Sequence, residues 1–198
     1  MTRIVLIAAL ASAAFGQPKT ENAKLQTRAV NGALEASFRT LVSSSVEPAW
    51  IGYQVAQVSG ERSMCGTVSL EGAREFVVLY RVAAGQVEKI RTYASDCTFD
   101  GGDLPLYWLT GVDGSQSAML LASFIPPADP SDRKSVQWQL ANSALSAISR
   151  HLDGAPALID LARRPQVSSQ LRQEAVRWLG RSKDPRATKF FEEILAAR

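Results

Sequence analysis

Apolar and polar residues alternate through the middle of the chain at the spacing of β-strands. The segment 49–58 is rich in β-forming residues, and Phe76, Val78 and Tyr80 alternate with other residues before an Ala-Ala-Gly-Gln turn. A second strand-like run, from Val87 to Tyr93, follows that turn, and 104–111 is also rich in β-forming residues. The pattern predicts a β-hairpin with further strands, in a small antiparallel sheet.

Later segments have their apolar residues at helical spacing instead. Asp113, with Gln116 three residues later, marks the start of a helix that carries an apolar stripe. The segments 139–162 and 171–195 each contain two apolar stripes separated by turn residues. The spacing therefore predicts two pairs of helices in the last third of the chain.

The segment 19–45 gives a weaker signal. It consists largely of polar helix-forming residues with a few apolar residues on one side, and Gly32 interrupts it. We expect a helix here that packs against the sheet.

The two helix pairs repeat each other with a period of roughly 31 residues. Identical residues align at several positions, among them Gln139 with Gln170, Leu140 with Leu171, Ala144 with Ala175, and Asp153 with Asp184. Such a period, built from two short helices, is typical of stacked helical repeats, in which each unit buries its apolar face against its neighbours.

The second helix pair has a recognisable core, in which an apolar residue and Arg are followed by spaced Ala, Leu-Gly and then Asp-Pro-Arg-Ala. Its residues are Leu171, Arg172, Ala175, Leu179, Gly180, Asp184, Pro185, Arg186 and Ala187. This core resembles the HEAT-like repeats of phycobilin lyases, over about residues 133–198 only. The resemblance implies a helical hairpin and, usually, a protein-binding surface, but not lyase activity.

These patterns predict an α+β fold, in which a small disulfide-stapled antiparallel sheet domain is followed by a C-terminal α-helical array of HEAT-like hairpins. A run of prolines between the two parts opposes regular structure and marks the boundary. The predicted parts are a signal peptide at 1–16, an N-terminal α+β domain at 17–125, a Pro-rich linker at 126–132 and HEAT-like helical repeats at 133–198.

The N-terminus has the order of a secretory signal peptide. Arg3 provides a basic start, an apolar run extends from Ile4 to Phe15, and small residues precede Gln17. A membrane anchor is the alternative, although the run is shorter than the roughly 20 residues that span a bilayer. We expect a secreted bacterial protein of the periplasm or cell envelope, with no stable membrane span after signal cleavage.

Cys65 and Cys97 are the only cysteines, and in an oxidising compartment such a pair most simply forms a disulfide bond. Closing this loop would stabilise the fold by roughly 3 to 4 kcal/mol in the loop-entropy model. A redox enzyme would normally place its two cysteines two residues apart. A zinc site would need more ligands than these thiols and His151 supply.

The charge pattern bears on the choice of partner. The formal net charge is +3 and the basic residues are scattered, so we expect no nucleic-acid partner. Arginines crowd the last helices, where acidic residues are interleaved with them. The predicted partner is a protein of unknown identity that contacts Arg172, Arg177 and Arg186, and an ordinary solvated helical face is the alternative.

Candidate catalytic and metal-binding residues are few. His151, the only histidine, precedes Asp153 at a helix end, where a cation favours the helix dipole without any chemical role. The loop with Asp96, Asp100 and Asp103 could wrap a cation but lacks the ligand spacing of an EF-hand. We predict no catalytic residue, no metal site and no cofactor.

Together these observations predict a secreted, non-catalytic protein-interaction scaffold that uses its short repeat array for binding. One alternative is an envelope enzyme of unrecognised type with a site in the N-terminal domain, for which the acidic loop, Tyr107 and Trp108 are the candidate residues. A purely structural module is the other alternative.

Overall fold

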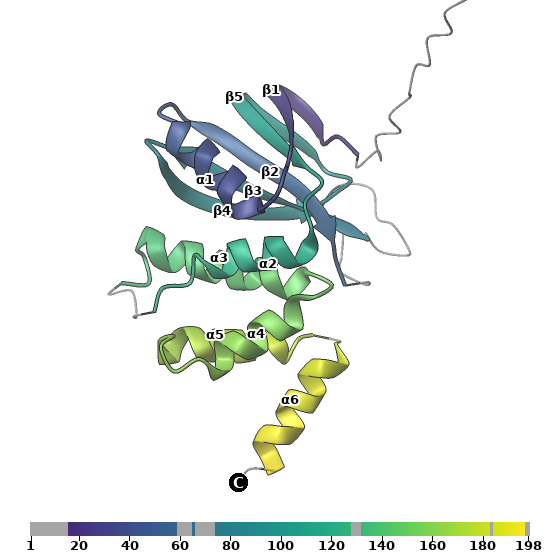
Figure 1. The fold of residues 1–198 in the computed structure, drawn as a ribbon, viewed down its shortest axis with the longest axis vertical. Coiled ribbons are helices and arrows are strands. Elements are labelled where there is room, and N and C mark those ends of the chain that lie inside the picture. Colours follow the sequence, from purple (N-terminus) through teal and green to yellow (C-terminus); the bar gives the residue numbers. More distant parts are fainter. Residues whose placement is uncertain (1–15, 59–64, 66–73, 128–131, 183, 197–198) are drawn as a thin grey trace, which may run out of the picture.

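The computed structural model combines one β-sheet with helices that are stacked beside it in successive layers (Figure 1). It describes residues 16–58, 65, 74–127, 132–182 and 184–196. The predicted signal peptide, apart from Gly16, lies outside the described residues.

Three strands of the sheet are antiparallel neighbours. β2 (Ala49–Ala56) pairs with β3 (Glu75–Ala83), which pairs with β4 (Gln86–Ala94). Between β3 and β4, Ala84 and Gly85 have φ angles of 49° and 70°, as the two central residues of a type I′ turn require. The hairpin predicted from the alternating pattern is therefore confirmed.

The other two strands run parallel to their neighbours. β5 (Thr98–Thr110) lies between β2 and β1 (Lys19–Ala29) and is parallel to both, giving the order β1-β5-β2-β3-β4. The prediction of an antiparallel sheet is therefore wrong, because the sheet is mixed. β5 follows β4 in the chain after only residues 95–97, but it lies on the other side of the antiparallel unit, next to β2.

The segment expected to form a helix at 19–45 is a strand followed by a helix. β1 is mostly exposed and polar, and its backbone hydrogen-bonding groups pair with those of β5. Gly32, with a φ of 92°, lies between β1 and α1 (Leu34–Ser44). The buried residues of α1 are Leu34, Phe38 and Leu41.

One face of the sheet is covered by α1, α2 (Gly114–Ala122) and α3 (Val136–Arg150). Asp113 caps α2 as predicted, because its side chain accepts hydrogen bonds from the backbone N–H groups of Ser115 and Gln116. The Gln116 side chain accepts a 3.0 Å hydrogen bond from the backbone N–H of Leu34. The beginnings of α1 and α2 are thus tied together.

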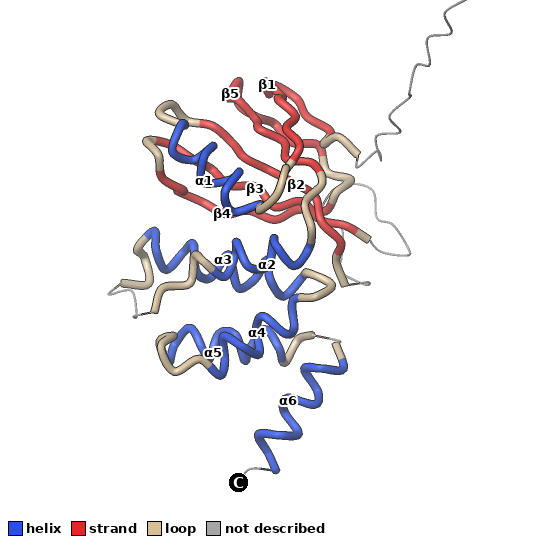
Figure 2. The backbone as a smooth tube through the Cα atoms, in the orientation of Figure 1, coloured by secondary structure: helices blue, strands red, loops and turns tan. Residues whose placement is uncertain are grey.

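The remaining helices are α4 (Gly154–Arg163), α5 (Ser169–Leu179) and α6 (Pro185–Ala196). Figure 2 shows α4 and α5 in the layer beyond α2 and α3, with α6 at the end furthest from the sheet. The main contact of α6 is with α4. The prediction of a separate C-terminal helical array is wrong, because α1 lies between two strands in the chain and α2 and α3 pack directly on the sheet.

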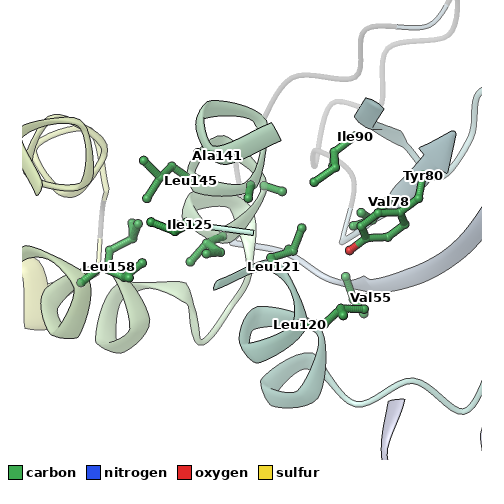
Figure 3. Close-up of a cluster of buried hydrophobic side chains, with 14 of the residues drawn as sticks. Val55, Val78, Tyr80, Ile90, Leu120, Leu121, Ile125, Ala141, Leu145 and Leu158 are labelled. Carbon is green, nitrogen blue, oxygen red and sulfur yellow. The ribbon is translucent and has the colours of Figure 1, made fainter. Parts of the chain in front are cut away.

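One hydrophobic cluster extends from the sheet into the last helices. Figure 3 shows part of it, in which strand residues lie on one side and helix residues on the other: Val55, Val78, Tyr80, Ile90, Leu120, Leu121, Ile125, Ala141, Leu145 and Leu158. The same cluster includes Leu179 of α5 and Phe190 of α6. Burial of this apolar surface is the main stabilising contribution that the helices and the sheet share.

Candidate functional site

The two cysteines form the predicted disulfide bond. Cys65 and Cys97 are 5.3 Å apart at their Cα atoms, and both cysteines of the sequence are used in this bond. Such bonds persist in oxidising compartments, so the disulfide indicates a location outside the cytosol. None of the helices in the described part of the chain has the length and apolarity needed to cross a bilayer.

His151 lies in a buried chain of hydrogen bonds. Its Nε2 is 2.7 Å from Ser117 Oγ, and its Nδ1 is 2.9 Å from the carbonyl oxygen of Ala147. Ser117 Oγ lies 2.8 Å from the Tyr53 hydroxyl, which is 2.7 Å from the Tyr80 hydroxyl. Because a carbonyl only accepts, Nδ1 carries the proton of the neutral ring, and Nε2 accepts from Ser117.

Burial determines the protonation of these groups. Desolvation lowers the pKa of His151 to about 4, although the Ala147 carbonyl and the charge of Asp153 act in the opposite direction. Desolvation also raises the pKa of Tyr53 to about 12 and that of Tyr80 well above its ordinary value. His151 is therefore neutral at pH 7, and its interpretation as a cation at a helix end is wrong.

This network joins the sheet to the helices. The Phe76 ring packs edge-on against the imidazole of His151, with 4.9 Å between the ring centroids. The backbone of His151 forms a β-bridge with Gln57, just beyond β2. Ser117 and His151 have the spacing of a nucleophile and its base, but they are 0% and 1% exposed. Both side chains are therefore closed to a substrate in this structure.

The acidic loop forms a tight turn at the beginning of β5. Asp100 Oδ1 accepts hydrogen bonds from the backbone N–H of Gly102 at 2.9 Å and from the Asn22 side chain at 3.4 Å. Asp103 has a φ of 61° in the same turn. Within the described ranges, no group of three or more His, Cys, Asp or Glu residues is placed to hold a metal ion.

The two aromatic candidates of the enzyme alternative lie on different faces of the sheet. Trp108 is buried in a small cluster on the face without helices. Tyr107 packs against the main core and contacts the Arg28 guanidinium, 4.9 Å from its ring centroid. The structure therefore does not bring Tyr107 and Trp108 into one site.

The three predicted partner-binding arginines are separated. Arg172 and Arg177 are five positions apart on α5, which places them about 140° apart around the helix axis. Arg177 forms an ion pair with Glu174. Arg186, at the beginning of α6, bonds Asp184 at 2.6 Å, and this contact raises the pKa of Arg186 and lowers that of Asp184.

Of these arginines, Arg186 lines a groove between α4 and α6. The groove has a volume of about 400 Å³, with cationic, anionic and apolar side chains around it: Pro156, Ile159, Asp160, Arg163, Arg186, Lys189, Phe190 and Glu193. Arg163 forms an ion pair with Glu193 across the groove, and its guanidinium lies 5.4 Å from the Phe190 ring centroid. The groove therefore has an apolar floor with a mixed, slightly basic rim.

The end of α6 extends this groove as an exposed apolar face. Phe190 is buried against α4, whereas Ile194 and Leu195 are 43% and 69% exposed. Ile194 lies one helical turn after Phe190 and continues the same apolar stripe. Large exposed apolar side chains that adjoin a groove are common at binding surfaces.

Comparison of the chain with protein-family models, curated proteins and solved structures found no match. The geometry itself defines a mixed sheet with helices stacked in layers on one face. In the described part of the chain, we take the groove between α4 and α6 as the candidate binding site. It is lined by Arg186, which the sequence predicts to bind a partner.

Proposed function

We propose that the chain is a secreted, non-catalytic interaction protein that binds a partner protein through the groove between α4 and α6 and the exposed face of α6. The observation that carries this proposal is the apolar stripe of Phe190 and Ile194, which begins inside the groove and ends in solvent, with the exposed Leu195 next to it. Secretion is supported by the signal-like order of residues 1–16 and by the disulfide bond.

The groove fits one face of an amphipathic helix. Ile159 and Phe190 provide apolar contacts, and the lining has three cationic and two anionic side chains. Lys189 takes part in no ion pair among the residues that the structure describes, so its charge is available to an incoming carboxylate. The partner segment is therefore a helix with an apolar stripe flanked by acidic residues. The resemblance to HEAT-like repeats supports the same kind of partner.

Substitutions on α6 test this proposal. Leu195→Asp and Ile194→Asp each place a charge on the exposed end of α6, and each should weaken partner binding by about tenfold or more. Met119→Asp is the matched control, because Met119 is 64% exposed on α2, outside the groove. Each purified variant is immobilised and used to capture proteins from a bacterial envelope extract.

The expected result is one partner that the unchanged protein and Met119→Asp retain and that both α6 variants lose. Equal capture by Leu195→Asp and the unchanged protein would show that the groove is not the site. Capture of the chain's own second copy would show self-association instead of partner binding.

The three predicted arginines are tested by charge reversal. Arg186→Glu should weaken capture more than Arg172→Glu or Arg177→Glu, because only Arg186 lines the groove. Asp100→Asn should leave capture unchanged. If Asp100→Asn instead abolished a turnover on an envelope substrate, the enzyme alternative would replace this proposal.

A further inference from the structure

The face of the sheet opposite the helices has a hydrophobic cluster of its own. Leu79, Leu106 and Trp108 are buried there, and the cluster includes no residue from the described helices. Gly52 allows these side chains to approach β2 closely, since a Cβ atom at this position would lie 2.5 Å from Leu79 Cδ2. The cluster forms a firm apolar floor on this face.

A cavity of about 240 Å³ lies on this floor, beside the disulfide bond. Its lining residues include three aromatic side chains and one carboxylate: Trp50, Leu79, Tyr93, Phe99, Asp100 and Leu106. Tyr93 lies near the end of β4 and Phe99 near the beginning of β5, and their rings are in contact beside the short connection between those two strands. Since an engineered protein cavity of about 150 Å³ holds benzene, the space is sufficient for a compact organic group.

The lining has the chemistry of a cation site. The ring centroids of Tyr93 and Phe99 are 5.6 Å apart with an interplanar angle of 57°, so the rings form two inclined walls. Aromatic faces attract cations, and the carboxylate of Asp100 adds a full negative charge. The hydrogen bond from the Gly102 backbone N–H to Asp100 Oδ1 helps to hold that carboxylate in place.

Arg81, Lys89 and Arg91 lie on this face of the hairpin but outside the cavity lining. Arg81 lies over the Trp50 ring at 5.8 Å from its centroid, and Arg91 is paired with Leu79 in the sheet. Neither residue lines the cavity, and Asp100 is the charged side chain among the described lining residues. The described lining residues therefore carry one negative charge.

We propose that this cavity binds a quaternary ammonium group, with Tyr93 and Phe99 as the cage walls and Asp100 as the counter-ion. This site lies on the sheet and is separate from the groove between α4 and α6, so it adds a small-molecule ligand to the proposed protein partner. Affinity for such a ligand should depend on its charge as well as on its shape.

Three ligands of similar shape separate these contributions: choline, its neutral analogue 3,3-dimethyl-1-butanol and its anionic analogue 3,3-dimethylbutanoate. Each is titrated into the full-length mature chain by calorimetry, and the fluorescence of Trp50 in the cavity wall provides a second signal. We expect choline to bind about tenfold or more tightly than either analogue. Equal binding of all three, tighter binding of the anion, or no binding of choline at millimolar concentration would overturn the proposal.

A pair of substitutions in the acidic turn locates the site. Asp100→Asn removes the negative charge with little change of shape, and it should abolish the preference for choline over the neutral analogue. Asp103→Asn removes a charge from the same turn, but Asp103 does not line the cavity, so choline affinity should be unchanged. Unaltered thermal unfolding shows that both variants are folded. A preference for choline that survives Asp100→Asn would contradict the assignment.

Discussion

Acidification should destabilise this protein in a pH range that is determined by His151. The imidazole is buried between Phe76 and the Ser117 hydroxyl, and its Nδ1 is committed to the Ala147 carbonyl. A second proton on Nε2 would break the bond that Nε2 accepts from Ser117, and it would place a positive charge in the core. The two neighbouring charges act on the pKa of His151 in opposite directions, because Asp153 favours that proton and Arg150 disfavours it. Desolvation therefore dominates.

The magnitude follows from the two pKa values. The pKa is about 4 in the folded protein and 6.5 ordinarily, and each pH unit of difference corresponds to about 1.4 kcal/mol, so the full effect is about 3 kcal/mol. As the pH falls below 6.5 the unfolded chain binds a proton and the folded chain does not. The stabilisation is therefore complete above pH 6.5 and is lost progressively toward pH 4. Asp113 and Asp184, whose pKa values are lowered by hydrogen bonds, lose their contributions only below 3.8.

Urea unfolding between about pH 7 and about pH 4.5 measures this effect. The free energy of unfolding should fall by about 2.5 kcal/mol over this range for the unchanged protein. His151→Gln should be less stable at pH 7, because the ring contacts are lost, but its stability should change much less with pH. Parallel losses in the two proteins would refute the assignment to His151.

Three further predictions concern packing and the disulfide, and each is measured by chemical denaturation. Gly52→Ala should cost about 1–3 kcal/mol, because the new methyl group overpacks the floor of the cavity, and an unchanged midpoint would show that the cluster yields easily. Leu179→Ala should cost about 2–5 kcal/mol and the exposed Arg177→Ala less than about 0.5 kcal/mol, so equal effects would show that the faces of α5 are wrongly assigned. Replacing Cys65 and Cys97 by Ser should cost about 2–4 kcal/mol, and thiol labelling of the unfolded native protein should find neither cysteine free.

Local patterns were sufficient for the elements whose partners are close in sequence. The β3–β4 hairpin follows from alternation on both sides of Gly85, and the start of α2 follows from the capping side chain of Asp113. β1 was missed because its residues are polar and exposed, so its extended conformation depends on pairing with a distant strand. Strand direction in the sheet and the packing of helices on it also depend on distant contacts, which periodicity does not encode.

The candidate sites also divide into those that the sequence predicts and those that depend on distant contacts. The disulfide could be predicted from the presence of two cysteines in a chain with a signal-like N-terminus. The network of His151 could not, because Tyr53 and Tyr80 look like ordinary strand aromatics, and Ser117 looks like a small helix residue. The available signal was the position of Ser117 on the buried stripe of α2, where a polar side chain needs a partner.

The position of β5 in the sheet has a consequence for how the chain folds. β5 is the last strand to be synthesised, yet it lies between β1 and β2. The antiparallel unit of β2, β3 and β4 can form early from contacts close in sequence. The partner of β1, in contrast, lies about 80 residues later in the chain, so β1 can pair only after β5 has been synthesised. Until β5 enters, two exposed strand edges face each other across an empty position, and both could pair with another chain. Assembly of this sheet is therefore completed from its interior, and the interval before that step is when the nascent protein is most exposed to aggregation.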